Sequence, residues 1–205
     1  METTNLVKFS TVGVARIQLL RTFTRLGCQS CDSSRYFTSA ERVLIARKVK
    51  KHSSNGLVPI ITPISASPSL EINDSLSICE YLAESYPEFN LWPRDQHLRA
   101  LARSATPEMQ SGYSETRNRY NTNFVAIYNG IVPATFQSKN EIDRLLAVWN
   151  QSRIVTMERS KVLGEKDEGF LFGEFGIACA FFWHVLWRFR KYGLQLDAAS
   201  SEVLA

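Results

Sequence analysis

The sequence changes character once, at the connector Tyr86–Pro93, and this change most constrains the fold. Upstream of the connector, short apolar runs of strand type alternate with amphipathic stretches of helical period. Downstream, the apolar residues recur at helical spacing. Two prolines bracket the connector and favour a break between the two patterns. We therefore expect an α/β domain over residues 1–86, followed by an all-helical domain over residues 95–205.

The first part follows the order strand, helix, strand, helix, strand, strand, helix. Pro59 lies inside an apolar strand-like run, which places that strand at a sheet edge, a bulge or a special turn. Asp74-Ser75 supplies an N-cap for the last helix of this part, whose apolar face begins immediately behind it. The expected strands are residues 5–9, 28–36, 57–61 and 70–72, and the expected helices begin near Ser10, Thr38 and Asp74.

The second part contains a first long helix, a second amphipathic helix and an apolar helix. Ser138 and Glu141 form a capping-box pattern before the second helix. Residues 164–173 are expected to form a loop. Residues 177–187 are apolar on all sides, which predicts a helix in the middle of a bundle. The apolar positions of the first long helix are Leu98, Leu101, Ala102, Ala105 and Met109.

Composition excludes several classes of protein. Of the 205 residues, 44% are apolar and 11% aromatic, so the chain can bury a sizeable core and wholesale disorder is excluded. The apolar runs are shorter than the roughly 18 residues that span a bilayer. Glu2, Lys8 and Arg16 fit neither a signal peptide nor a transit peptide. We expect a cytoplasmic protein with no membrane partner.

The net charge of +4 is unevenly distributed, because residues 1–52 hold ten Lys or Arg residues and three acidic residues. The basic cluster at 47–51 ends a helical pattern, where cations interact favourably with the helix dipole. A nucleic-acid surface would need cations and interleaved aromatic residues on one face. We therefore favour a solvated helix face over a nucleic-acid patch and expect no nucleic-acid partner.

The cysteines and histidines do not predict a metal site. The chain has four Cys and three His residues, and Cys28 and Cys31 form the one C-x-x-C pair. A tetrahedral zinc site would need a second pair or two nearby histidines. The Cys28–Cys31 pair also follows a helix-like stretch rather than opening one, which disfavours a reactive thiol. A thiol oxidoreductase is kept as a minor alternative.

Four segments, in this order and spacing, carry a resemblance to a known family. They are Leu57–Ile61, Glu71–Pro87, Arg99–Arg117 and Phe170–Gly193, and together they cover most of residues 57–193. The chain resembles the cytosolic glutathione transferases, and the last two segments resemble a bacterial and fungal branch of that family. The resemblance implies a thioredoxin-like N-terminal domain, an all-helical C-terminal domain, glutathione as co-substrate and a homodimer.

The catalytic hydroxyl of the family falls near the N-terminus. Phe9–Leu19 can be aligned with serine-type starts, including the zeta-class isomerases, and Ser10 then stands as the thiolate donor, with Thr11 second. Thr11 replaces the cysteine of the zeta motif, and Val12 replaces the tryptophan of the bacterial and fungal branch. The subclass therefore stays open. The alternative is that Ser10 and Thr11 are helix N-caps.

The resemblance also implies a glutathione site in the first domain. Val58 would pair with the cysteinyl part of glutathione as an added edge strand, with Pro59 in the cis form fixing the bend. Ser75 would bind the γ-glutamyl carboxylate, and Asp74 would lie close to the amine. Lys50, Lys51 or His52, just before the turn at Gly56, would reach the glycine carboxylate. The alternatives are an ordinary edge-strand proline and a plain capping pair.

The helical domain is expected to line the pocket for a second substrate, a small apolar electrophile. Candidate wall residues share helical spacing on the first long helix, although for one of them, Met109, core packing is an equal alternative. His184 lies in the apolar helix and is expected to be a core histidine rather than a base. The four candidates are Met109, Tyr113, Arg117 and Tyr120.

Two departures from the family pattern bear on activity. The core helix of the branch begins with Ser-Ile-Ala-Asp, whereas this chain has Gly176 to Cys179, which removes the acidic capping side chain. Family members generally continue into another terminal helix beyond the position of Ala205, so a truncated bundle is expected. We expect a glutathione-dependent transferase or cis–trans isomerase. The alternative is a non-catalytic binding or scaffold protein of the same fold.

Overall fold

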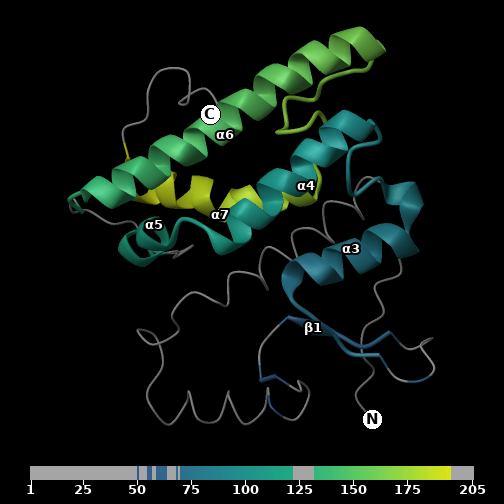
Figure 1. Ribbon diagram of the computed structural model, residues 1–205, viewed down its shortest axis with the longest axis horizontal. Coiled ribbons are helices and arrows are strands. Elements are labelled where there is room, and N and C mark those ends of the chain that lie inside the picture. The colour runs from purple at the N-terminus through teal and green to yellow at the C-terminus, as the bar shows by residue number, and fades with distance from the viewer. Residues whose placement is uncertain are drawn as a thin grey trace.

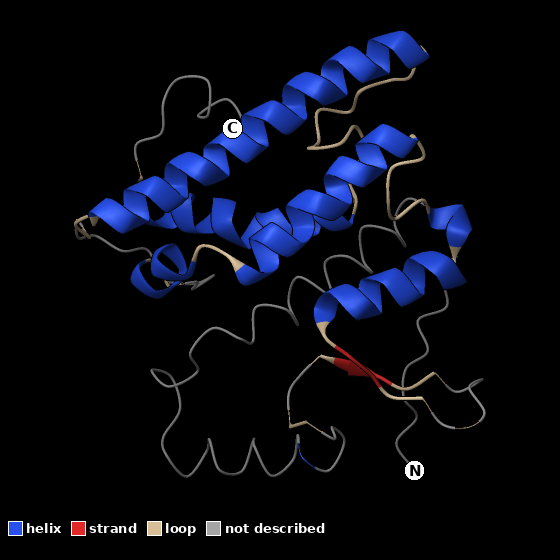
Figure 2. Ribbon diagram, viewed as in Figure 1, coloured by secondary structure: helices blue, strands red, loops and turns tan. Residues whose placement is uncertain are grey.

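A computed structural model describes residues 50, 55–56, 59–63, 68, 70–121 and 132–194 of the chain. The described part of the first domain consists of a small sheet and one helix, and the rest is helical (Figures 1 and 2). An α/β portion followed by an all-helical portion is the fold class that the sequence predicts, and it is confirmed for these residues. The domain limits 1–86 and 95–205 stay a prediction.

The described sheet pairs β1 (Ile60–Ile61) with β2 (Ile72–Asn73) in antiparallel orientation. Ile60 lies opposite Asn73, and Ile61 lies opposite Ile72. The observed β2 begins at the last residue of the predicted strand 70–72. It therefore runs directly into the start of the following helix, which brings the end of the sheet and the helix N-terminus together.

Helix α3 (Ser75–Ser85) begins where the sequence predicts, with Asp74 as its N-cap. Its buried residues are Ile78 and Cys79, both on the predicted apolar face. The connector that follows contains a short 3-10 helix, η3 (Pro87–Phe89). Leu91 and Trp92 are buried at the end of this connector and anchor it to the helical part.

Helix α4 (Gln96–Ser111) begins at the N-cap Asp95 and buries one face against the bundle. Leu101, which we expected on that face, is 38% exposed. The polar Thr106 is buried instead, and its hydroxyl donates a hydrogen bond to the carbonyl oxygen of Ala102 at 2.8 Å. The buried residues of α4 are Leu98, Ala102, Ala105, Thr106 and Met109.

The first long helix expected from the sequence is broken at Gly112 and Tyr113. Helix α4 ends at Ser111, and a separate helix, α5 (Ser114–Arg119), follows. A Cβ atom on Gly112 would lie 2.6 Å from the carbonyl oxygen of Glu108, so only glycine fits this position. Tyr113 has φ 59°, in the left-handed region, which turns the chain. The expectation of one helix through Tyr120 was therefore wrong.

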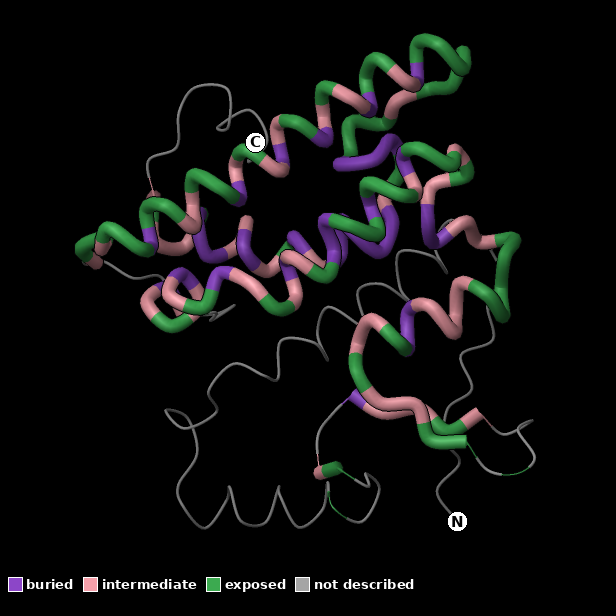
Figure 3. Tube along the Cα trace, viewed as in Figure 1, coloured by how far each residue is buried: buried purple, intermediate pink, exposed green. Residues whose placement is uncertain are grey.

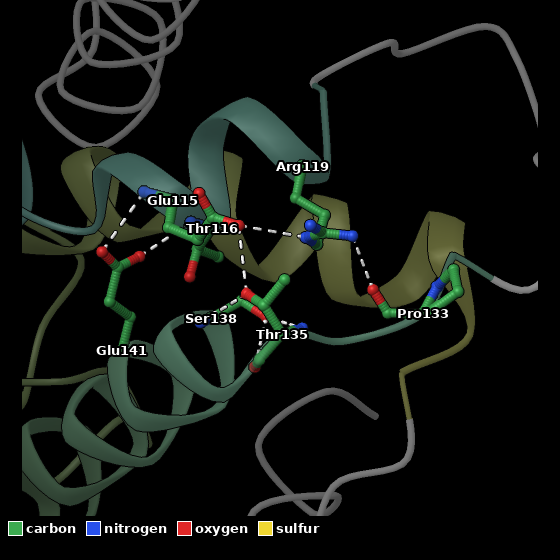
Figure 4. Close-up of polar contacts among 7 residues, drawn as sticks. All are labelled: Glu115, Thr116, Arg119, Pro133, Thr135, Ser138 and Glu141. Atoms are coloured by element: carbon green, nitrogen blue, oxygen red, sulfur yellow. Dashed lines mark hydrogen bonds and ion pairs between the residues drawn. The ribbon is translucent and has the colours of Figure 1, made fainter.

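Helix α6 (Phe136–Leu163) starts three residues before the predicted capping box. Thr135 is its N-cap, and Thr135 and Ser138 form a reciprocal capping box (Figure 4). Glu141, which we expected to complete a box with Ser138, caps a different helix. Its carboxylate accepts hydrogen bonds from the backbone N–H groups of Glu115 and Thr116, at 3.2 and 2.7 Å. The prediction failed because both Thr135 and Ser138 are suitable caps and the pattern does not rank them.

Helix α7 (Ile177–Tyr192) packs against α4 and supplies much of the core. Its buried positions include Ile177, Phe182 and Phe189, as the sequence predicts for a central helix. Trp183 is 47% exposed, so the helix is not enclosed on all sides. The N-cap is Gly176, which makes no side-chain capping bond, as expected. Figure 3 shows the buried positions of α4, α6 and α7 gathered where these helices face one another.

Candidate functional site

The start of α3 is the candidate ligand-binding turn that the structure describes best. Asp74 is exposed and has φ 73° and ψ 135°, a conformation that residues other than glycine rarely adopt. Its Oδ1 accepts hydrogen bonds from the N–H groups of Leu76 and Ser77, at 2.8 and 3.2 Å. The capping-pair alternative is therefore realised at Asp74. Ligand binding at Asp74 stays a prediction.

Ser75 has the donors that a carboxylate ligand would need. As the first residue of α3, its N–H group has no carbonyl within the helix to bind. Among the described residues, neither this N–H group nor the Ser75 hydroxyl has a hydrogen-bond partner. The N–H groups of Leu76 and Ser77 are already bound by Asp74. Two unpaired donors at a helix N-terminus fit an anionic ligand group.

Asn73 adds an unpaired acceptor beside this turn. Its Nδ2 donates a hydrogen bond to Glu71 Oε1 at 3.0 Å. Its Oδ1 is buried and has no hydrogen-bond partner. Buried polar atoms without partners are uncommon in folded proteins. The end of β2 and the start of α3 therefore carry both donors and an acceptor that the described residues do not satisfy.

Pro59 is the described part of the predicted edge-strand site. It is buried and directly precedes β1. Asn73 pairs with Ile60, so Pro59 lies next in sequence to the strand that contacts the Asp74 turn. The remaining candidates of the first domain, Ser10, Thr11, Lys51, His52 and Val58, lie outside the described residues. Cys28 and Cys31 lie outside them as well.

A groove of about 570 Å³ runs between α3 and α4 next to Asp74. One wall is held by Glu80, whose carboxylate accepts hydrogen bonds from Trp92 Nε1 at 3.0 Å and from Arg103 at 2.9 and 3.2 Å. The Arg103 guanidinium also lies 5.6 Å from the centre of the Trp92 ring. The groove is lined by Ile72, Asp74, Leu76, Ser77, Glu80, Tyr81, Glu84, Trp92, Arg103 and Pro107.

The four candidate wall residues of the second-substrate pocket are divided between α4, the turn and α5. Met109 and Tyr120 have no exposed surface, and neither lines the groove. This packing favours the core alternative for Met109. Tyr113 is also buried, and its hydroxyl donates a hydrogen bond to Glu108 Oε1 at 2.8 Å. Arg117 donates a hydrogen bond to the carbonyl oxygen of Met109.

Burial shifts the pKa values of two side chains, His184 of α7 and Cys79 of α3. Burial, together with the charges of Arg188 and Arg117, lowers the pKa of His184 to about 3, so this histidine is neutral near pH 7. Burial raises the pKa of the Cys79 thiol to about 12, and the charges of Glu80 and Asp74 act in the same direction. Cys79 is therefore an inert core thiol. His184 is a neutral, partly buried residue, in line with a structural role.

A second cavity, of about 300 Å³, lies where the start of α4, the end of α6 and the start of α7 meet. Gly176, Ile177 and Cys179 contribute to its lining. None of the site residues predicted from the sequence lines it.

Within the described ranges, no group of three or more His, Cys, Asp or Glu side chains is placed to hold a metal ion. No helix in the same ranges is both long and apolar enough to cross a membrane.

Two residues that the sequence analysis did not single out lie near the start of α3 and the groove beside it. Gln110, on the last turn of α4, donates a hydrogen bond to Asp74 Oδ2. Glu80 joins α3 to Trp92 and to Arg103 of α4. Both lie within the segments that carry the family resemblance. Their roles depend on contacts between residues 12 to 36 positions apart, and no local spacing pattern indicates such contacts.

No protein-family model matches this chain, and no curated protein matches it. One similar solved structure is the crystal structure of a glutathione S-transferase from the Antarctic clam Laternula elliptica, with 19% sequence identity and a TM-score of 0.44. The similarity covers 82% of this chain and 78% of that chain. A likeness at this identity and TM-score assigns neither a family nor a function, so the fold described above rests on the elements of this chain alone.

Proposed function

We propose that this protein is a glutathione-dependent enzyme of the glutathione transferase type that acts on a small apolar electrophile. The observation that carries the proposal is the start of α3. There the Ser75 N–H and hydroxyl groups have no partner among the described residues, and the Asp74 carboxylate lies beside them. The γ-glutamyl end of glutathione carries a carboxylate and an ammonium group on one carbon atom. Ser75 suits the first group and Asp74 suits the second.

The rest of the tripeptide is proposed to follow the edge of the sheet. Val58, directly before the buried Pro59, would pair its backbone N–H and carbonyl groups with the cysteinyl residue of glutathione. Lys51 or His52 would bind the glycine carboxylate. This arrangement would extend the ligand from the start of α3 along the strand that contains Pro59, so that its sulfur lies in the middle of the site.

The chemical step requires an ionised sulfur. A cysteine-like thiol has a pKa of about 8.5, and lowering that pKa by two units requires about 2.7 kcal/mol of preferential stabilisation of the thiolate. Ser10, with Thr11 as the second candidate, is proposed to donate a hydrogen bond to this thiolate. The thiol proton passes to solvent, and the thiolate sulfur forms a bond to the electrophilic carbon. At the same time that carbon either releases a leaving group with its bonding electron pair or gives up one bond of a conjugated double bond, whose electrons move onto the rest of the substrate. Conjugation ends at the thioether, whereas cis–trans isomerisation breaks the C–S bond again and regenerates glutathione.

The helical part is proposed to bind the electrophile beside the sulfur. Tyr113 and Arg117, at the break between α4 and α5, remain the candidates for this wall. Tyr113 keeps its proton, because burial and its hydrogen bond to Glu108 raise its pKa. A homodimer and a cytoplasmic location are further parts of the proposal that come from the family resemblance. The subclass is left open, as is the choice between conjugation and isomerisation.

The alternative is a protein that binds glutathione without turnover. The observation that favours it is the start of α7, where Gly176 makes no side-chain capping bond. The family pattern has a serine and an aspartate here, so this chain has lost a stabilising device in its core helix. A less stable α7 would still allow glutathione to bind at the start of α3, even if the catalytic geometry is lost.

Isothermal titration with glutathione tests the proposal. We expect the wild-type protein to bind, Ser75→Ala to bind about tenfold more weakly, and Ser85→Ala, at the exposed end of the same helix, to bind as the wild type does. Because Asp74 caps α3, Ser75→Ala leaves the helix start intact. Absence of binding to the wild-type protein would show that the proposal is wrong.

An ultraviolet titration of the bound thiolate separates the enzyme from the binding protein. In the enzyme, the bound thiol ionises at lower pH than free glutathione, and Ser10→Ala moves this ionisation back toward that of the free thiol. If the wild-type protein binds glutathione but leaves its thiol pKa unchanged, the non-catalytic alternative holds. A product mass that includes glutathione identifies conjugation, and an unchanged mass identifies isomerisation.

A further inference from the structure

The cavity of about 300 Å³ between the start of α4, the end of α6 and the start of α7 has no part in the proposed function. Its apolar lining includes Trp92, Leu98, Phe172 and Ile177, each less than a tenth exposed. Small-molecule sites are typically of about 300 to 1,000 Å³ and mostly apolar, with a few polar groups that orient the ligand. The cavity is therefore large enough for a small molecule with an apolar body.

The first turn of α7 lines this cavity and leaves a backbone donor unused. The N-cap Gly176 has no side chain that could accept a hydrogen bond. The N–H group of Ile177 donates to the carbonyl oxygen of Leu91 at 3.0 Å, and that of Ala180 donates to Gly176 at 3.1 Å. The N–H group of Ala178 has no partner within the described part of the chain. A free N–H group at the positive end of a 16-residue helix favours an anion.

Ser160 is an independent indication of a ligand at the same place. It lies on the last turn of α6, is 6% exposed and lines the cavity. Its hydroxyl group forms no hydrogen bond with any other residue that the structure describes. Buried polar side chains in folded proteins nearly always have a partner. The Ser160 hydroxyl and the Ala178 N–H group thus give the cavity two hydrogen-bond donors, which a carboxylate can accept.

The exposed edge of the cavity carries more acidic than basic residues. A further acidic residue of the lining, Asp95, is already paired with Arg159. A ligand that is only an anion meets net negative charge at this edge, whereas a ligand with a cationic group of its own is attracted to it. The exposed acidic lining residues are Glu165, Glu168 and Glu174, and the exposed basic ones are Arg94 and Lys166.

We propose that this cavity binds a free α-amino acid with an apolar side chain. The α-carboxylate accepts hydrogen bonds from the Ala178 N–H group and the Ser160 hydroxyl. The α-ammonium group lies toward the acidic edge, and the apolar side chain packs against Trp92 and Phe172. Neither Asp74 nor Ser75 lines the cavity, so this site is independent of the proposed glutathione site.

Calorimetric titration with L-phenylalanine and three related compounds tests the proposal. N-acetyl-L-phenylalanine lacks the ammonium group, and L-phenylalaninamide lacks the carboxylate. We expect the wild-type protein to bind L-phenylalanine about tenfold or more tightly than either derivative, because each derivative loses one charged contact. Glycine keeps both charged groups but lacks the apolar body, so it should also bind about tenfold or more weakly.

A serine variant with a matched control tests the carboxylate contact. We expect Ser160→Ala to bind L-phenylalanine about tenfold more weakly and L-phenylalaninamide with less than about a twofold change. Ser152→Ala changes another buried serine of α6 that does not line the cavity, so it should bind both compounds as the wild type does. Both variants should keep the wild-type affinity for glutathione.

A second variant keeps the test decisive if Ser160→Ala unfolds. Gly176 has φ −142°, which residues other than glycine readily adopt. In Gly176→Asp, the new carboxylate caps the first turn of α7 and takes the place of the ligand carboxylate. We expect this variant to melt at or above the wild-type temperature and to lose L-phenylalanine binding.

Four results would overturn the proposal. The first is a wild-type protein that does not bind L-phenylalanine, and the proposed glutathione site would then be unaffected. The second is equal affinity for L-phenylalaninamide, which would mean that the start of α7 binds no carboxylate. The third is equal affinity for N-acetyl-L-phenylalanine, because the site would then take a peptide C-terminus or a simple carboxylate. The fourth is a folded Ser160→Ala or Gly176→Asp protein with the wild-type affinity for L-phenylalanine, since the ligand would then bind elsewhere.

Discussion

Helices α3 and α4 begin with the same device and use it differently. In each helix an aspartate N-cap accepts hydrogen bonds at Oδ1 from two backbone N–H groups, those of Leu76 and Ser77 in α3 and of His97 and Leu98 in α4. The other oxygen has a different partner. Asp95 Oδ2 is bound by the guanidinium of Arg159, whereas Asp74 Oδ2 is bound by the amide of Gln110.

The two N-cap residues also differ in solvent exposure and in backbone conformation. The Asp95 side chain is 9% exposed and its backbone is extended, with φ −65°. Asp74 is exposed and has φ 73°. A residue other than glycine held at positive φ costs of order 1 kcal/mol and is more frequent at functional sites. Asp95 is thus paired with a cation, whereas Asp74 is exposed and has a strained backbone. An N-cap aspartate thus identifies a helix start, while the partner of its second oxygen separates a structural cap from a candidate binding site.

The largest expected effect concerns stability. Asp95→Ala removes the cap of α4 and the hydrogen bonds to Arg159, and we expect it to lower the free energy of unfolding by about 2 kcal/mol. Asp74→Ala removes a cap and a contact with a neutral amide, so about 1 kcal/mol is expected. Urea denaturation measures both values. Equal losses at the two positions would remove the distinction between the caps.

The pH dependence of stability provides a second comparison. The hydrogen bond from Arg159 holds the pKa of Asp95 at about 2, below the value of about 3.9 for an unfolded chain. The unfolded state therefore binds this proton first, and the stabilisation is present above about pH 4 and is lost as the pH falls toward 2. The difference in unfolding free energy between wild type and Asp95→Asn should be constant from pH 7 to about pH 5 and should shrink below that.

Other acidic groups do not obscure this comparison. The pKa values of Glu108 and Asp167 are also lowered, by their hydrogen bonds to Arg144 and Arg153 respectively. Both pairs are present in the wild type and in Asp95→Asn, so their contributions cancel in the difference. A difference that stays constant down to pH 2 would mean that the contact between Asp95 and Arg159 does not stabilise the folded state in solution.

Local features of the fold could be predicted from the sequence, because they depend on residues within one or two turns. The cap at Asp74 and the buried pair Ile78 and Cys79 follow from the hydrogen-bonding needs and the period of a helix. The central position of α7 follows from an apolar content that one face cannot hold. The loop from Gly164 follows from its helix-ending glycine, which adopts φ 65°.

Features that depend on distant contacts could not be predicted. The period of α4 continues through Tyr113, but the chain turns at Gly112 because a backbone conformation outweighs the periodicity. Glu141 caps α5 instead of its own helix, since the two helices come together only in the folded chain. The pairing of Gln110 with Asp74 has the same origin. The N-cap at Asp74 was therefore predictable, whereas the side chain that contacts the second oxygen of its carboxylate was not.

The cap that Glu141 supplies to α5 offers a comparison with a cap from another helix. Its carboxylate accepts hydrogen bonds from the N–H groups of Glu115 and Thr116 (Figure 4). We expect Glu141→Ala to cost about 1 kcal/mol of unfolding free energy, in the range of an ordinary N-cap. Glu141→Gln keeps one acceptor and should cost about half as much. If Glu141→Ala has no effect, a cap supplied by a neighbouring helix is weaker than the caps at Asp74 and Asp95.

The smallest expected change in stability is also the sharpest test of the comparison between the two caps. Asparagine is as good an N-cap as aspartate, so Asp74→Asn keeps the hydrogen bonds to the start of α3. It removes the charge and replaces Oδ2, which accepts a hydrogen bond from Gln110, with an amide NH2 group. We expect its unfolding free energy to change by less than about 0.5 kcal/mol. Its affinity for glutathione should fall about tenfold, because the ammonium group of the ligand loses its anionic partner.

The same substitution at the other cap is expected to show the opposite pattern. Asp95→Asn breaks the contact with Arg159 and should lower stability, while its affinity for glutathione stays at the wild-type value. Thermal unfolding measures the stability of each variant, and calorimetric titration measures its affinity for glutathione. If Asp74→Asn loses as much stability as Asp95→Asn and binds glutathione normally, Asp74 is a structural cap like Asp95. The proposal that the start of α3 binds glutathione would then be wrong.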